Sequence, residues 1–277
     1  MRSYTHVFKV FATWVGLLVL AALTVGPFLW LLVTALKGGG ENIFAYPPSL
    51  WPAQPTLDNF RQVWEAVPFG RYFFNSVLVA VASVALNLIL ASLAAFPLAR
   101  MRFRGREPFF VMILATMMIP LPVIMIPLFV LSQRLGLLNS YSGLILPTAV
   151  SAFGIFLMRQ AFLAIPREIE EAAVIDGANP WQVFWQVMLP LTKPSLATLA
   201  IFVFVGSWGD FLWPLIVLKD PDLYTLPVGI SYLAGTFSAN WRLIAAGSVL
   251  SILPIVAVFI ALQRFFIGGQ TAGAVKG

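Results

Sequence analysis

Few residues in this chain could do acid–base, nucleophilic or metal chemistry. Among its 277 residues there is one His, at position 6, and no Cys. A thiolate nucleophile, a disulfide and a metal site built from His or Cys are therefore excluded. The phosphate-binding pattern GxxxxGK[ST] is also absent, so the chain lacks this means of holding a nucleotide. We expect no catalytic residue, no metal ligand and no cofactor in the chain itself.

Two polar residues within apolar sequence are candidates for a substrate path. Asp210 is the only carboxylate in a predicted membrane helix, where an acid is costly enough to indicate a function. At 1.5 Å per residue it lies about 24 Å from the cytoplasmic start of that helix, so it could border a cavity or pair with Lys219 or Arg242. Asn87 is the second candidate. A structural role is the alternative for both, because polar side chains also tie membrane helices together.

A polar segment, residues 164–193, separates two long apolar stretches. Pro166 and the acidic residues after it predict a helix start, and Gly177 predicts its end because Gly adopts the left-handed conformation at low cost. Asn179 and Pro180 predict a second start, and Pro190 and Pro194 predict its end before the next apolar stretch. An apolar stripe follows at helical spacing: Val183, Phe184, Val187 and Met188. A plain connector is usually shorter, so this segment indicates a docking surface for a soluble partner.

The composition requires a membrane. The chain is 60 % hydrophobic and 10 % charged, with a mean hydropathy of +0.91. A chain of this composition has too few polar side chains to cover its apolar surface in water. About 20 helical residues cross the hydrocarbon layer. Six stretches are long enough, which predicts an all-α membrane protein with six transmembrane helices in one domain, 1–277. They are residues 7–36, 72–98, 108–132, 141–163, 194–218 and 243–266.

The basic residues predict the orientation. With the N-terminus inside, eleven of the 17 Lys and Arg residues fall on the cytoplasmic side, including the run from Arg100 to Arg106. This excess indicates that both termini are cytoplasmic. The net charge of +6 is therefore explained by the orientation of the chain in the membrane and does not indicate nucleic-acid binding.

Two further segments can be interpreted from their prolines. The outer loop, 37–71, is Pro-rich, with a short helix expected at 58–66. In the stretch 108–132, Pro120, Pro122 and Pro127 each remove a backbone donor, so this helix must bend or break.

The polar segment also carries a family resemblance. Glu171-Ala172-Ala173, Gly177 six residues after Glu171, and Val187-Met188-Leu189-Pro190 resemble the EAA loop of membrane subunits of ABC importers. The resemblance implies the type I ABC importer permease fold and a coupling helix seated in a cleft of an ATPase subunit. The ATPase-coupling residues that it implies are Glu170, Glu171, Ala172, Ala173, Asp176, Gly177, Ala178 and Pro190.

Three other segments narrow the resemblance to carbohydrate permeases of the maltose-transporter type, similar to the G subunit. Trp208 to Pro214 resembles the W-N-D/E-F-xx-P stretch, with Gly209 in place of the usual Asn, and Tyr224 to Gly229 resembles the outer loop before the last helix. The end, 267–277, resembles a tail that reaches the ATPase through Gln270, Thr271 and Lys276. By composition alone it is a flexible cytoplasmic terminus.

The resemblance implies a permease subunit of an ATP-driven importer in the bacterial or archaeal cytoplasmic membrane, carrying a sugar or sugar-like solute by alternating access. The implied partners are a second permease subunit, a homodimeric ATPase that binds ATP and Mg, and an external solute-binding protein. The alternative is an ATP-independent secondary transporter or channel, which inverted repeats or intramembrane coupling charges would indicate. An intramembrane enzyme is a third class, but it needs a catalytic constellation.

Overall fold

The computed structural model describes residues 2–234 and 240–274. Apart from one isolated bridge between Lys37 and Pro55, all regular elements of these residues are helices, which agrees with the predicted all-α class. Backbone contacts divide the chain into two compact units, Met1–Gly70 with Gly229–Leu253, and Arg71–Val228 with Pro254–Gly277. The single domain expected from the sequence stays a prediction.

In the first unit, α1 (Arg2–Leu36) leads into the Pro-rich loop and α2 (Asp58–Ala66). The boundaries of α2 confirm the helix predicted at 58–66. The buried amide of Asn59 donates 2.8 Å hydrogen bonds to the carbonyls of Ala35 and Lys37. These carbonyls lie at the end of α1, where no intrahelical donor is available, so Asn59 fixes α2 to α1.

The first unit also holds the later part of α13 (Leu226–Ser231), the short helix η4 (Tyr232–Ala234) and the start of α14 (Trp241–Ala274). The guanidinium of Arg242 donates to the carbonyl of Glu41, which attaches the start of α14 to the outer loop.

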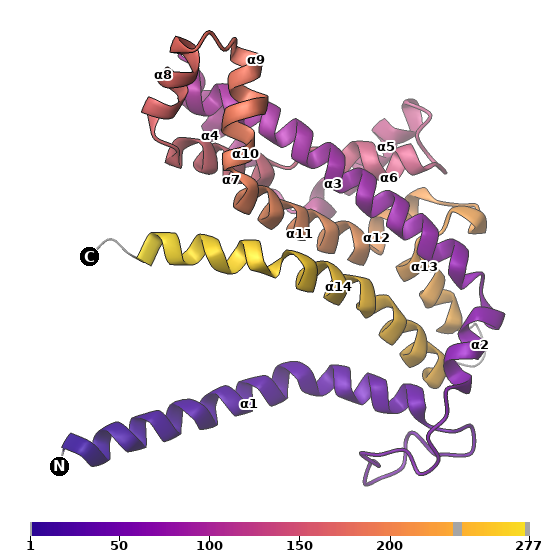
Figure 1. Ribbon diagram of the computed structural model, residues 1–277. Coiled ribbons are helices and arrows are strands. Elements are labelled where there is room, and N and C mark those ends of the chain that lie inside the picture. Colours follow the sequence, from indigo (N-terminus) through magenta and orange to yellow (C-terminus); the bar gives the residue numbers. More distant parts are fainter. Residues whose placement is uncertain (1, 235–239, 275–277) are drawn as a thin grey trace. The chain divides into compact units, whose positions relative to one another are not determined.

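The second unit is built along α3. Figure 1 shows α8 and α9 at the C-terminal end of α3, with α6 and α12 farther toward its N-terminal end. The elements of this unit are α3 (Phe69–Arg100), α4 (Arg106–Thr116), α5 (Leu121–Arg134), α6 (Tyr141–Ile145), η1 (Leu146–Thr148), α7 (Ala152–Ala164), α8 (Arg167–Ile175), α9 (Pro180–Gln182), η2 (Val183–Met188), α10 (Leu189–Leu191), α11 (Lys193–Gly209), α12 (Leu212–Val217) and η3 (Pro221–Leu223).

Three helices of the described chain are long and apolar enough to cross a membrane, and the number rises to six if each of three bent pairs forms one span. The long helices are Lys9–Leu36, Phe69–Arg100 and Trp241–Arg264. The pairs are Arg106–Thr116 with Leu121–Arg134, Tyr141–Thr148 with Ala152–Leu163, and Pro180–Leu191 with Lys193–Gly209, bent by 98°, 48° and 77°. Six spans thus match the expected number, but half of them are not continuous helices.

The breaks have local causes. The predicted break within 108–132 falls between α4 and α5, where Pro120 precedes the first turn of α5 and Pro122 lies within that turn. The stretch 194–218 was predicted as one helix, which is wrong, because Asp210 is extended and separates α11 from α12. The stretch 141–163 was also predicted as one helix, and this too is wrong. Ser151 interrupts it in an extended conformation, and its hydroxyl accepts from the Gly154 amide to cap α7. Such a cap starts a new helix because it satisfies an orphan donor.

At the N-terminal end of α3, Asn75 joins three segments. Its buried side-chain amide donates to the carbonyls of Asp222 and Tyr224, both at 2.9 Å, and its oxygen accepts from the Tyr141 hydroxyl at 2.7 Å. All of its side-chain hydrogen-bonding groups are therefore engaged, which holds α6 and the segment after η3 against α3.

Helix α14 continues through Ala274. The flexible terminus expected from composition therefore does not begin at residue 267.

Candidate functional site

The first candidate site is the segment from α8 to α10, here called the docking segment (residues 167–191). Its first helix ends as the sequence predicts. The Gly177 amide donates to the Val174 carbonyl at 3.0 Å and the Ala178 amide donates to the Ala173 carbonyl at 2.9 Å. With Gly177 at φ 87°, this pair of bonds is a Schellman motif, which closes a helix by satisfying its last carbonyls.

The second helix starts with a capping box. The Asn179 side chain accepts from the Gln182 amide, and the Gln182 side chain accepts from the Asn179 amide. Two orphan donors are thereby satisfied at once, and the predicted start at Asn179 is confirmed.

The second helix ends at Leu191, between Pro190 and Pro194, which agrees with the predicted end before α11. Pro190 itself does not interrupt the helical path, because the chain passes through a π-helical turn at Val183–Met188 into α10, where Pro190 lies in the first turn. Proline has no N–H for the α-helical bond to Gln186, and a π-turn beside it changes the bonding register. The helical path continues to Leu191, and α11 begins at Lys193.

Arg100 fixes the docking segment to the membrane helices. Its side chain is 3 % exposed. The guanidinium donates to the carbonyls of Phe162 and Ile165, the latter at 2.5 Å, at the end of α7. It also lies 3.5 Å from the carboxylate of Glu170 on α8. One side chain therefore links α3, α7 and α8.

An aromatic cluster provides a second attachment. The rings of Phe96 on α3, Phe162 on α7 and Phe184 on η2 have centroids 5.1 to 6.1 Å apart, and all three side chains are buried. Aromatic pairs at such distances are favourable beyond their burial. Movement of the docking segment is therefore coupled to α3 and α7 through packed side chains.

The opposite face of the docking segment is exposed and partly apolar. Ile175 is 85 % exposed and Trp181 is 64 % exposed. Exposed apolar residues framed by polar ones mark protein contact surfaces. The carboxylate of Glu171 and the Schellman turn at Gly177 lie on this same short segment.

Most predicted coupling residues are grouped together. Glu170, Glu171, Ala172 and Ala173 lie on α8, and Asp176, Gly177 and Ala178 form its end, whereas Pro190 lies apart on α10. The side chains of Gln270 and Thr271, on α14, and residue Lys276 lie outside the described residues. Contact of all these residues with an ATPase stays a prediction.

The second candidate site is a cavity of about 510 Å³ in the second unit. Asn87 on α3 and Asp210, between α11 and α12, both line it, so the structure brings the two predicted path residues together. The Asp210 carboxylate accepts from the Trp213 amide at 3.4 Å. Of the two alternatives for Asp210, bordering a cavity is confirmed, whereas no ion pair with Lys219 is found among the described residues of the second unit. A role in substrate binding stays a prediction for Asn87 and Asp210.

Two arginines were interpreted from the sequence only as orientation signals. Besides Arg100, Arg159 on α7 is buried. Its guanidinium donates to the carbonyl of Leu98 at 3.1 Å and to the two carboxylate oxygens of Glu107 at 2.9 and 3.1 Å. It also lies 4.0 Å from the centre of the Phe110 ring. A structural role could have been suspected from its place within an apolar helix, because buried charges need partners.

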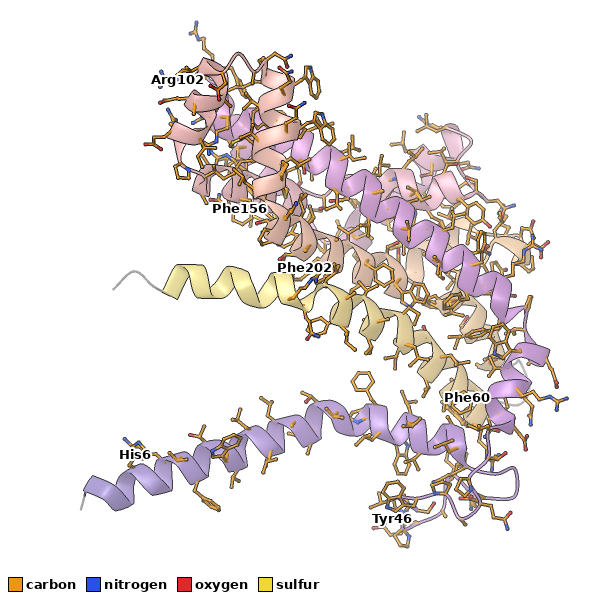
Figure 2. All side chains as sticks on the ribbon, in the orientation of Figure 1. His6, Tyr46, Phe60, Arg102, Phe156 and Phe202 are labelled. Carbon is orange, nitrogen blue, oxygen red and sulfur yellow. The ribbon has the colours of Figure 1, made fainter. Side chains whose placement is uncertain are left out.

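Figure 2 shows Arg102, which follows the end of α3, at the docking end of this unit, and Phe202 farther along α11.

The model of a known protein family matches residues 87–269. The family is described as the binding-protein-dependent transport system inner membrane component, and the chain belongs to it. It is accordingly a multi-pass membrane permease subunit of an ABC transport system. The match covers both the docking segment and the cavity-lining parts of α7 and α11.

Relatives agree over nearly the whole chain. The arabinooligosaccharides transport system permease protein AraQ of Halalkalibacterium halodurans is 40 % identical, covering 95 % of either chain. The lactose transport system permease protein LacG of Rhizobium radiobacter is 35 % identical, covering 92 % of either chain. The sn-glycerol-3-phosphate transport system permease protein UgpE of Yersinia enterocolitica is 34 % identical, covering 87 % of this chain and 89 % of UgpE.

Solved structures agree on the fold. A chain of a bacterial ABC transporter involved in the import of the acidic polysaccharide alginate superposes with a TM-score of 0.82 at 27 % identity, covering 96 % of this chain and 98 % of that one. A chain of the MetNI methionine ABC transporter, at 18 % identity, gives a TM-score of 0.56 over 72 % of this chain and 95 % of that one. The fold is that of a type I ABC importer permease.

Proposed function

We propose that this chain is one of two permease subunits of an importer for a sugar or sugar-like solute, and that a separate ATPase drives it through the docking segment. A homodimeric ATPase binds ATP and Mg, and an external binding protein delivers the solute. The chain contributes conformational change and no catalytic group. The system works in the cytoplasmic membrane by alternating access.

The observation that carries this proposal is the construction of the docking segment. One face is exposed and apolar at Ile175 and Trp181, and the other is attached to α3 and α7 through Arg100 and Phe184. A force applied to the exposed face would reach α3 and α7 through these contacts. The printed names of the relatives AraQ and LacG support a carbohydrate as the solute. No observation favours the secondary-transporter alternative.

The test is a charge reversal on the docking segment, Glu171→Lys, in the complete complex. We expect the ATPase subunit to copurify with this variant in a much smaller amount, or receptor-stimulated ATP hydrolysis to fall on the order of tenfold, because one lost charged contact costs about 1.5–3 kcal/mol. The variant should still insert, because Glu171 is exposed.

The matched control is Glu65→Lys on α2. It makes the same change of charge at another exposed Glu, whose pair with Arg61 lies at the surface and contributes little to stability. Normal ATP hydrolysis and normal copurification in Glu171→Lys would refute docking through α8.

A further inference from the structure

The cavity beside Asp210 contains two hydrogen-bonding groups that the protein does not use. The hydroxyls of Ser83, 1 % exposed, and Thr225, 4 % exposed, have no hydrogen-bond partner among the described residues, and both residues line the cavity. Buried polar groups are almost always hydrogen-bonded, because burying them unpaired costs free energy. Two such groups at one cavity indicate that something entering it completes their bonds.

The cavity has the construction of a small-molecule site. Its volume of about 510 Å³ lies within the roughly 300–1,000 Å³ typical of ligand pockets, which combine apolar walls with a few polar groups. Phe153 on α7 and Phe202 on α11 line it, with ring centroids 5.2 Å apart. Besides the indole of Trp213, the polar side chains of the lining are those of Ser83, Asn87, Thr148, Ser151, Ser207, Asp210 and Thr225.

The charge of the lining discriminates among solutes. Among the described residues that line the cavity, Asp210 is the single ionisable one, and no Lys, Arg or His accompanies it. An anionic solute would leave water without meeting a counter-charge, which carries a large desolvation penalty. A neutral polyol that enters the cavity loses only the hydrogen bonds between its hydroxyls and water. It can replace these hydrogen bonds with bonds to Ser83, Asn87 and Thr225, and can donate to the Asp210 carboxylate.

We propose that this cavity is a solute subsite contributed by this chain for a neutral, hydroxyl-rich solute. The hydroxyls of Ser83 and Thr225 bind the solute, and the carboxylate of Asp210 rejects anions. The proposal rests on the proposed importer function and narrows it. Relatives include both a lactose permease and a permease for sn-glycerol 3-phosphate, which is an anion, so the charge class distinguishes two kinds of substrate.

The natural absence of Cys allows a direct test of the cavity. In the full complex, assembled with Cys-free partner subunits in proteoliposomes, Ser83→Cys is treated with two methanethiosulfonates of equal length, one ending in an ammonium group and one in a sulfonate. The thiolate forms a mixed disulfide and releases methanesulfinate. We expect the ammonium reagent to react faster, on the order of tenfold, because the carboxylate of Asp210 favours a cation.

Two further variants separate charge and access. Asp210→Asn in the Ser83→Cys background should bring the two rates together. Ser92→Cys is the matched control, since Ser92 lies on the same helix, is equally buried and unpartnered, and does not line the cavity. It should react with neither reagent. Lactose and arabinotriose, as neutral probes, should slow modification of Ser83→Cys, whereas glycerol 3-phosphate should not.

The outcomes distinguish this subsite from the importer function. Equal rates for the two reagents in the presence of Asp210, protection by glycerol 3-phosphate alone, or no reaction in either the ATP-free or the ATP-bound complex would each overturn the subsite. Any of these results together with normal receptor-stimulated ATP hydrolysis would leave the importer function intact. Absence of that hydrolysis in the unaltered complex would refute the importer function itself.

Discussion

At the scale of single residues, Arg100 shows how one side chain can join three helices. Its guanidinium reaches two carbonyls at the end of α7 and the carboxylate of Glu170 on α8. A planar guanidinium presents several donors in a fixed geometry, whereas the ammonium of Lys is a compact point charge on a flexible stem. Its planar geometry therefore matters here as much as its charge.

We predict that Arg100→Lys keeps the chain inserted but lowers the thermal midpoint of the complex and its receptor-stimulated ATP hydrolysis. The lost bonds leave buried carbonyls unpaired, at about 1–3 kcal/mol each. Arg102→Lys is the control, because Arg102 is exposed and has no ion-pair partner among the described residues. Thermal melting and ATP hydrolysis measure both effects. Equal behaviour of the two variants would contradict a linking role for Arg100.

At the scale of elements, the conformation of the docking segment depends on the turn at Gly177. Gly177 has φ 87°, yet no atom lies within 4 Å of where its Cβ would be. A side chain at this position would therefore suffer conformational strain and no collision. In L-residues the left-handed conformation costs about 1–2 kcal/mol, and Asn tolerates it better than β-branched residues do.

We predict that Gly177→Asn retains most receptor-stimulated ATP hydrolysis and that Gly177→Val loses most of it, because Val strains the Schellman turn. Gly136→Val provides the matched control. Gly136, in the turn between α5 and α6, has φ 68° and equally open space, so its variant should lose similar thermal stability without losing coupling. If Gly136→Val impaired ATP hydrolysis as strongly as Gly177→Val, the loss would reflect stability alone.

At the scale of the whole molecule, the exposed apolar surface requires the hydrocarbon layer of a membrane around it. In the helix Lys9–Leu36 the most apolar 18-residue window has a hydropathy of 2.3 and no buried residue. Leu23, for example, is 70 % exposed. Such a surface is stable in hydrocarbon and not in water. The distribution of basic residues then predicts the orientation.

We predict that the loop after α3 and the loop after α1 lie on opposite sides of the membrane. Single cysteines can be introduced into this Cys-free chain and treated with a membrane-impermeant maleimide. Phe103→Cys should react only in inverted vesicles, and Tyr46→Cys should react only in right-side-out vesicles. Both parent side chains are exposed, so access is not limited by packing. Labelling of both sites from one side would contradict the assigned orientation.

The sequence by itself determined the membrane class and the local ends of the docking segment, where Gly177 closes the first helix and Asn179 caps the second. These features depend on local properties: apolar length, the φ preference of Gly177, and side-chain bonds across three or four residues, as in Asn179 with Gln182. The break near Pro120 was predictable for the same reason.

Only the tertiary structure decided what joins these elements. Arg100 meets a carbonyl 62 residues away, and Asn75 one that is 147 residues away. The cavity likewise forms only where side chains of α3, α7, α11 and several shorter segments meet. The hydroxyls of Ser83 and Thr225, which lack a partner within the described part of the chain, therefore could not be distinguished in the sequence from ordinary polar contacts. Residues so distant in the chain become partners only when the helices pack. Neither the composition nor the local hydrogen-bonding pattern of the sequence predicts that packing.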